Sequence, residues 1–168
     1  FMSNLIPEKG IFEFLDALKA LISAEIPFEA KIAGSIPDDQ NDLLEKINIL
    51  DNIEYLGVVS GKLKTELLSW GNVFCLPTYY PMEGQPISII EAMGFGNFIV
   101  TTNHAGIPDI CCKKNSLFVQ KRDSKSLFKG LLELSKSMNQ LESISLKNLQ
   151  NARKKFSEDA FISGILKI

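Results

Sequence analysis

The chain has 168 residues, of which 45% are apolar and 23% are charged, and its formal net charge is −2. These values are typical of one globular domain with a sizeable core, exclude a disordered chain and argue against a nucleic-acid partner. No segment approaches the roughly 20 apolar residues of a membrane helix, and three cysteines make no disulfide framework, so we expect a cytoplasmic protein with reduced thiols.

Short apolar runs alternate with amphipathic segments along the first half of the chain. We expect a strand over residues 1–6 and a helix over residues 10–24, where apolar residues recur at helical spacing. Pro27 ends that helix. The other predicted elements of this half are a strand at 28–33, a helix at 38–47, a strand at 53–56, and a helix that Ser60 caps and that ends near residue 70.

The second half continues the alternation and then becomes helical. The predicted strands cover 73–76, 97–101 and 116–119. A helix is expected at 85–95, and a short helical turn after the loop at 102–108. From Asp123 onward the pattern predicts helix almost to the end of the chain, with a break at Ser157, which is a suitable cap for the last segment.

This order of elements predicts a doubly wound α/β fold. The expected sheet is parallel, has about six strands, carries helices on both faces and is Rossmann-like, with a helical C-terminus. In open parallel sheets the ligand lies at the carboxyl ends of the strands. The sequence therefore places a site among five loops, at residues 4–10, 34–38, 57–61, 77–86 and 102–108.

The segment at residues 77–96 is the richest in residues that can carry chemistry. Gly84 and Pro86 suit the start of a helix, whose free amides and partial positive charge form a ready site for a phosphate. Glu83 precedes that start, so it fits an anion site only if its carboxylate accepts hydrogen bonds from hydroxyl groups. Glu91 lies at the edge of the apolar stripe of the helix, and the alternative to a binding role is a carboxylate that points to water.

Seven residues separate Glu83 from Glu91, and the two frame a Gly-x-Pro turn. This segment resembles the E-x7-E motif of family 4 glycosyltransferases, which have the GT-B fold. Five further segments are similar to that family, at residues 4–10, 32–34, 55–58, 106–109 and 156–157. The resemblance therefore covers nearly the whole chain.

The resemblance implies that residues 1–168 are the nucleotide-sugar-binding, C-terminal domain of a retaining, hexose-transferring glycosyltransferase. Phe1 falls within an apolar run and is no initiator, so we expect a chain cut from a longer protein, with its N-terminal acceptor domain absent and no turnover by itself. The implied reaction moves a sugar from a nucleoside diphosphate sugar to a saccharide or lipid-linked acceptor in surface polysaccharide biosynthesis.

The resemblance also implies a role for each residue of the donor site. Glu83 is the catalytic carboxylate and contacts sugar hydroxyls, Glu91 holds the ribose hydroxyls, and Lys9 neutralises the diphosphate. The other implied donor-binding residues lie in the turns and at the helix start: Asn4, Gly34, Gly57, Val58, Gly84, Gln85, Pro86, Ile87 and Ser88. Gly57 and Val58 accommodate the base, and amides at about Gln85 to Ser88 hold the diphosphate.

Asn4 departs from the family pattern, which commonly has an arginine at this position. An asparagine donates a hydrogen bond but supplies no charge and no fork of donors, so charge compensation depends more on Lys9 and on the helix start. Asp38 and Asp39 are adjacent and lack the Asp-x-Asp spacing of metal-dependent transferases, so no metal and no cofactor are predicted. His104 is interpreted as an ordinary loop histidine, with contact to the donor as the alternative.

Three alternatives stay open at this point. The same fold also serves catalytically silent nucleotide-binding or regulatory modules, and the departure at Asn4 favours that interpretation. An epimerase with a related two-domain fold fits the Glu-Gly-x-Pro run less well. The basic run 153–155 is interpreted as a solvated helix face, with contact to the anionic inner face of a membrane as its alternative.

Overall fold

A computed structural model describes residues 1–40 and 42–165 of the chain. Five strands lie in this part of the sequence: β1 (Ala30–Ile32), β2 (Ile53–Tyr55), β3 (Val73–Leu76), β4 (Phe98–Thr102) and β5 (Ser116–Val119). The helices are α1 (Ile11–Ser23), α2 (Leu43–Asn48), α3 (Gly61–Trp70), α4 (Ile87–Gly94), α5 (Ser124–Ser135), α6 (Met138–Lys155) and α7 (Glu158–Ile165). Two 3-10 turns complete the list, η1 (Pro7–Lys9) and η2 (Ile107–Asp109).

All strand pairs are parallel, which confirms the predicted α/β class. β1 pairs with β2, while β3, β4 and β5 form a second sheet in that order. The expected count of about six strands is wrong for the described residues, because the segment before η1 forms only one isolated bridge, between Met2 and Ala33. That segment still runs beside β1, where Ser3 N donates to Ala33 O at 3.1 Å.

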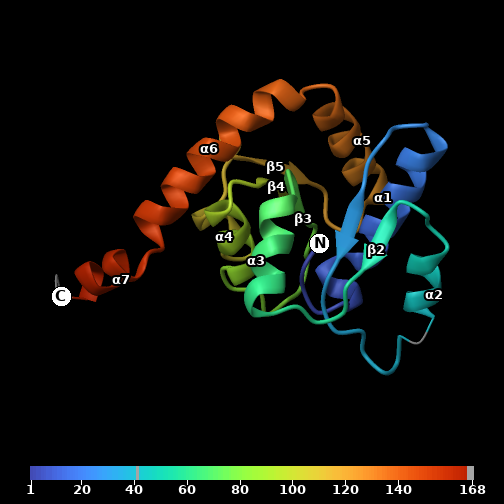
Figure 1. The fold of residues 1–168 in the computed structure, drawn as a ribbon, viewed down its shortest axis with the longest axis horizontal. Coiled ribbons are helices and arrows are strands. Elements are labelled where there is room, and N and C mark those ends of the chain that lie inside the picture. Colours follow the sequence, from blue (N-terminus) through green and yellow to red (C-terminus); the bar gives the residue numbers. More distant parts are fainter. Residues whose placement is uncertain (41, 166–168) are drawn as a thin grey trace.

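The helices cover the sheets on both faces and enclose one core (Figure 1). α1 packs along α5, and α4 packs along α6. The predicted apolar stripe of α1 is buried at Ile11, Phe14, Leu15, Leu18 and Leu21. α7 lies at the outer end of α6, away from the sheets (Figure 1).

Several helix boundaries differ from the expectation, for local reasons. The helix predicted at 38–47 begins only at Leu43, because two turns precede it: Gln40 N donates to Pro37 O, and Leu43 N donates to Gln40 O. Residue 41 of that prediction, and 166–168 of the predicted last helix, lie outside the described residues. The final helical region is interrupted after α5 as well as at Ser157.

The predicted caps have mixed outcomes. The Ser157 hydroxyl accepts a hydrogen bond from Ala160 N at 3.2 Å, so this cap is confirmed. The prediction for Ser60 is wrong: it occupies the N-cap position of α3, but its hydroxyl makes no cap hydrogen bond in the described structure. Asp123 caps α5 by accepting from Ser126 N at 2.9 Å, which fixes where the chain turns after β5.

Asn148 ties α6 to the sheet. Its side-chain amide is fully buried and donates to Asn97 O at 3.1 Å and to Asn115 O at 3.0 Å. Asn97 in turn donates to Leu68 O at 2.8 Å, at the end of α3. A ladder of asparagine amides therefore satisfies carbonyl groups that would otherwise be buried without a donor.

Replacing Asn148 with alanine is expected to lower the free energy of unfolding by about 3 kcal/mol, because two buried carbonyls lose their donor. Urea denaturation would measure the change. Asn151→Ala is the matched control, since Asn151 is exposed on the same helix and its replacement is expected to stay within about 0.5 kcal/mol of the wild type. Equal midpoints for both variants would contradict a structural role for the ladder.

Candidate functional site

The first predicted glutamate lies against the predicted phosphate-binding lysine. Lys9 closes η1, the turn after the first segment, and its Nζ lies 2.7 Å from Glu83 Oε2. The side chains are only 14% and 7% exposed, respectively. Lys9 Nζ also lies 4.8 Å from the centre of the Tyr80 ring. The loops after the first segment and after β3 therefore meet at one charged pair, screened from most of the solvent.

Thr78 supports the same carboxylate from inside the protein. Its side chain is fully buried at the end of β3, and its hydroxyl oxygen lies 2.8 Å from Glu83 Oε2 and 3.2 Å from Glu8 O. Thr102, at the end of β4, donates to Thr78 O. Two donors, Lys9 and Thr78, thus converge on one oxygen of Glu83, which leaves the other carboxylate oxygen for a hydroxyl of a ligand.

The two tyrosines of the loop after β3 contact charged side chains and the neighbouring loops. The Arg122 guanidinium lies 4.6 Å from the centre of the Tyr79 ring. Burial raises the pKa of the Tyr79 hydroxyl, and the nearby Glu13 carboxylate adds to this shift. Tyr80 O lies 2.7 Å from His104 Nε2, so a hydrogen bond from His104 holds this loop against the loop after β4.

The partner of His104 Nδ1 determines which ring nitrogen of His104 donates and which accepts. Lys121 Nζ lies 2.9 Å from His104 Nδ1, and an ammonium group can only donate. His104 Nδ1 is therefore the acceptor, and Nε2–H donates to the carbonyl of Tyr80. This arrangement links the loops after β3, β4 and β5 at the carboxyl edge of the sheet.

The predicted anion site is the start of α4. Pro86 is the N-cap residue, so it lies just before the first turn in which the sequence predicts it. Pro86 O accepts the first helical hydrogen bonds, from Ile89 N and Ile90 N, which leaves the amides of Ile87 and Ser88 ahead of them. No side chain in the described part of the chain caps this start.

A close backbone contact fixes the approach to that helix. A Cβ atom on Gly106 would lie 2.8 Å from Gly84 O, so the turn after β4 touches the turn before α4. Gly84 itself has open space around it, and Gln85 is exposed. The turn at residues 106–108 therefore packs against the start of α4. A larger residue at position 106 would displace that helix start.

The second glutamate is neither free nor directed only to water. Glu91 lies one turn inside α4, and its Oε1 is 2.5 Å from Lys64 Nζ on α3. The side chains of Lys64 and Glu91 are 35% and 30% exposed, respectively. Glu91 is therefore paired with a lysine and still partly open to water, and its binding role stays a prediction.

The turn predicted to accommodate a base lies beside β1 and β2. Gly34 N donates to Gly57 O at 2.8 Å, and the Tyr55 hydroxyl donates to Gly34 O at 2.8 Å. Gly57 has a φ of 65°, and the next residue, Val58, exposes most of its side chain. Asn4 is exposed nearby and accepts a hydrogen bond from the Ser35 hydroxyl at 3.1 Å.

The structure thus groups the predicted residues into two clusters and a helix start. One cluster joins Lys9 and Glu83, and the other joins Gly34, Gly57 and Asn4 at the ends of β1 and β2. Asn4 is hydrogen-bonded to Ser35, whereas Lys9 is paired with Glu83.

Sequence reasoning missed Lys64 and Thr78 as partners of the two glutamates. Lys64 precedes Glu91 by 27 positions on another helix, and no spacing rule connects them. Thr78 carries a weak signal, because it is a polar residue directly after the strand-ending Pro77.

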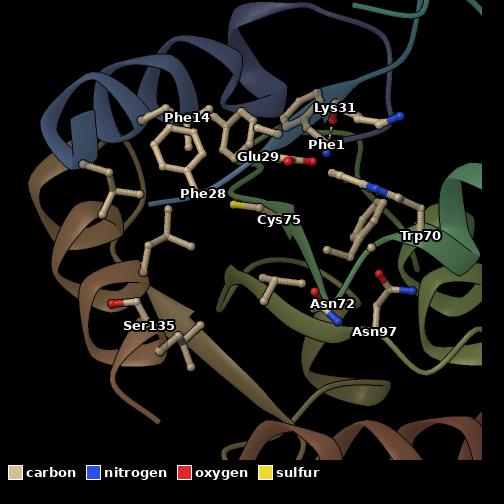
Figure 2. Close-up of a pocket in the computed structure, with 18 of the residues that line it drawn as sticks. Phe1, Phe14, Phe28, Glu29, Lys31, Trp70, Asn72, Cys75, Asn97 and Ser135 are labelled. Carbon is tan, nitrogen blue, oxygen red and sulfur yellow. Dashed lines mark hydrogen bonds between the residues drawn. The ribbon is translucent and has the colours of Figure 1, made fainter. Parts of the chain in front are cut away.

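A half-open cavity at the opposite edge of the sheets is distinct from this site. Its volume is ≈ 630 Å³, and it lies at the amino ends of β1 and β3, lined mostly by apolar side chains. Figure 2 shows Phe14 and Phe28 on one side of it and Trp70 on the other, with Cys75 between them. The predicted donor-site residues, all of which lie in the described part of the chain, are absent from its lining.

Residues 1–137 match the family described as glycosyl transferases group 1. The chain is 30% identical over 166 residues to WcaL of Salmonella typhimurium, a protein named as a putative glycosyltransferase of colanic acid biosynthesis. That alignment covers 94% of this chain and 40% of WcaL.

Two solved structures share the fold. HepE of Anabaena, crystallised with UDP and glucose, superposes with a TM-score of 0.83 at 19% identity, over 99% of this chain and 46% of its own. The C-terminal domain of the group 1 family protein LpcC of Francisella tularensis superposes with a TM-score of 0.80 at 18% identity, over 94% of this chain and 84% of that domain.

The chain spans less than half of the length of WcaL and of HepE, and most of the LpcC domain. These likenesses confirm the expected Rossmann-like, GT-B type of fold. Together with the match over residues 1–137, they establish that the chain belongs to the group 1 glycosyltransferases.

Proposed function

We propose that residues 1–168 form the donor-binding domain of a retaining glycosyltransferase that uses a nucleoside diphosphate sugar. One observation carries the proposal: Lys9 and Glu83 meet beside the uncapped start of α4. A cation and free helix amides suit a diphosphate, and a carboxylate suits sugar hydroxyls. The crystal structure of HepE with UDP and glucose supports a nucleotide sugar as the ligand of this fold.

In this proposal Lys9 keeps its ion pair with Glu83 and gains the diphosphate as a second partner when the nucleotide sugar binds. Its ammonium has three donors, so it can keep Glu83 and also donate to phosphate oxygens. Glu83 then accepts from sugar hydroxyls through the oxygen that Lys9 and Thr78 leave free. Glu91 accepts from the ribose hydroxyls, and the turn at Gly57 and Val58 receives the base.

Negative charge develops on the diphosphate as the bond between the anomeric carbon and its oxygen breaks. Lys9 and the amides at the start of α4 stabilise that charge, and no divalent cation takes part in the proposed step. The acceptor hydroxyl attacks from the face that the diphosphate leaves, and its proton passes to the departing phosphate oxygen. The configuration of the anomeric carbon is thereby retained.

The acceptor side of the reaction belongs to a further domain. We expect that domain to bind a saccharide or a lipid-linked acceptor, and the naming of WcaL for colanic acid biosynthesis supports a role in surface polysaccharide assembly. In the described part of the chain, no helix combines the length and the apolar character needed to cross a bilayer. The proposed place of action is the cytoplasm, at the inner face of the membrane when the acceptor is lipid-linked.

The second candidate is a nucleotide-binding module without transfer activity. It is favoured by Asn4, which is exposed, uncharged and engaged with Ser35 at the position where the related family commonly has an arginine. A donor site with one side-chain cation fewer binds and activates a diphosphate less strongly. Nucleotide binding without sugar-dependent affinity would identify this second candidate.

Calorimetric titration with UDP, GDP and ADP, and with their glucose or mannose conjugates, tests the proposal. One nucleotide is expected to bind, and Glu91→Gln is expected to weaken it by about tenfold, because a charged acceptor for ribose is lost. Glu66→Gln is the control, since Glu66 is an exposed carboxylate of α3 that pairs with Lys62. Absence of binding for every nucleotide, or equal effects of both variants, would refute the donor site.

A further inference from the structure

Lys64 stands out because it pairs with Glu91 from a different helix. Its Nζ lies 2.5 Å from Glu91 Oε1, and the pair bridges α3 and α4. α3 follows directly after the turn at Gly57 and Val58, and α4 follows the predicted phosphate site. A single ion pair therefore joins the two helices that lead away from the base and phosphate ends of the proposed nucleotide site.

The pair has a physical consequence once a ligand covers it. Glu91 is 30% exposed, so water solvates part of its charge in the free protein. A nucleoside lying on the carboxylate would displace that water, and an ionised carboxylate without water or a counter-ion is strongly destabilised. The Lys64 ammonium, 2.5 Å from Glu91 Oε1, supplies the compensating charge.

The pair also restricts the direction of the carboxylate. A glutamate side chain has three torsions and can adopt many rotamers on a helix surface. Lys64 contacts Oε1, which orients the carboxylate plane and leaves Oε2 and the second lone pair of Oε1 open. A ribose presents two adjacent hydroxyl donors, which match two adjacent acceptors held in one plane.

A purely structural role would look different. Ion pairs that are about one third exposed contribute little to stability, with typical values of about 0–1 kcal/mol. Lys64 also leaves part of its side chain open to solvent. Loss of the pair is therefore expected to change the melting temperature by only a few degrees, so that an effect on ligand recognition can be separated from an effect on folding.

We infer that Lys64 is a positioning residue that holds Glu91 for the ribose 2′-hydroxyl and so makes the site selective for ribonucleotides over 2′-deoxyribonucleotides. This inference rests on the proposed donor site, since Lys64 is inferred to orient Glu91, the residue proposed to contact ribose. Lys64 acts through Glu91 and touches neither the phosphates nor the reacting sugar in this assignment.

The test compares, by calorimetry, the affinity of the chain for UDP, GDP and ADP with its affinity for the 2′-deoxy form of each nucleotide. The wild type is expected to prefer the ribonucleotide by about tenfold, as for a hydrogen bond to a charged acceptor. Lys64→Met is expected to reduce that preference to about twofold or less, by weakening the ribonucleotide alone. Lys64→Arg, which keeps the charge, is expected to restore most of it.

Two controls make the result specific. Lys62→Met removes a neighbouring lysine whose side chain is 91% exposed on the same helix, and it is expected to keep the full preference. Glu91→Gln is expected to remove the preference, and adding Lys64→Met to it is expected to change nothing further, because a positioning residue has no effect without the group that it positions.

The outcomes separate the inference from the proposed function. If Glu91→Gln removes the preference and Lys64→Met keeps it, the positioning role is wrong while the donor site stands. If Lys64→Met weakens the binding of the ribonucleotide and of its 2′-deoxy form equally, Lys64 attracts the nucleotide only through its positive charge. The inference is then also overturned. If the wild type binds none of these nucleotides, the proposed donor site itself fails.

Discussion

Lys9→Met is expected to abolish measurable binding of a nucleoside diphosphate and to lower the free energy of unfolding by about 3 kcal/mol. Both effects come from one ammonium group. It pairs with Glu83 at 2.7 Å, and Glu83 is only 7% exposed. Without Lys9 the carboxylate keeps only the hydroxyl of Thr78, so a nearly buried charge is left without a counter-ion.

A double variant distinguishes the two effects. Lys9→Met with Glu83→Gln removes both charges, so stability is expected to recover to within about 1 kcal/mol of the wild type, while nucleotide binding stays lost. Urea denaturation and calorimetry on the same preparations would measure both quantities. Lys19→Met is the control, because Lys19 forms a loose, exposed pair with Asp16 at 3.7 Å. Recovery of binding in the double variant would show that Lys9 serves Glu83 alone and does not hold phosphate.

Gly34→Ala is expected to lower the free energy of unfolding by about 4 kcal/mol or more, a larger loss than for Asn148→Ala or Lys9→Met. Gly34 has a φ of 144°, in the region that favours glycine, and a Cβ atom there would lie 1.7 Å from Ser3 O. The clash involves backbone on both sides, and the two segments cannot separate without breaking the hydrogen bond between Ser3 N and Ala33 O.

The measurement is far-UV circular dichroism during urea or thermal denaturation, with the yield of folded protein as a first indication. Gly94→Ala is the matched control, since a Cβ atom at this last position of α4 meets no atom within 4 Å, and alanine favours helix. That variant is expected to be as stable as the wild type or slightly more so. A Gly34→Ala protein with an unchanged midpoint would contradict the close approach of the two segments.

The sequence was most informative for the strands of the second sheet, which are short runs rich in apolar residues. The predicted bounds of β3 and β5 agree with the structure, and β4 differs by one residue at each end. The first segment is predicted as a full strand because Phe1 to Ile6 is mostly apolar. Apolar character reports burial, however, and the number of ladder bonds depends on which neighbours lie within reach; here only one bridge forms in the described structure.

For the candidate site, a local motif located both glutamates but could not reveal their partners. Lys9 and Glu83 are separated by 74 positions, and their pairing follows from η1 and the loop after β3 meeting at the same edge. The partnership of Lys64 with Glu91 depends on how α3 lies relative to α4. Such pairings are decided by the three-dimensional arrangement of helices and carry no signature in residue spacing.

The asparagine ladder bears on how the domain should be delimited in experiments. The segment that matches the family ends at residue 137, whereas Asn148 reaches from α6 into the core and occupies two carbonyl groups there. A protein truncated at the end of the matched segment would leave both carbonyls without a donor and would uncover α4. The smallest autonomous folding unit is therefore longer than the segment at residues 1–137 that matches the family, and expression boundaries belong beyond α6.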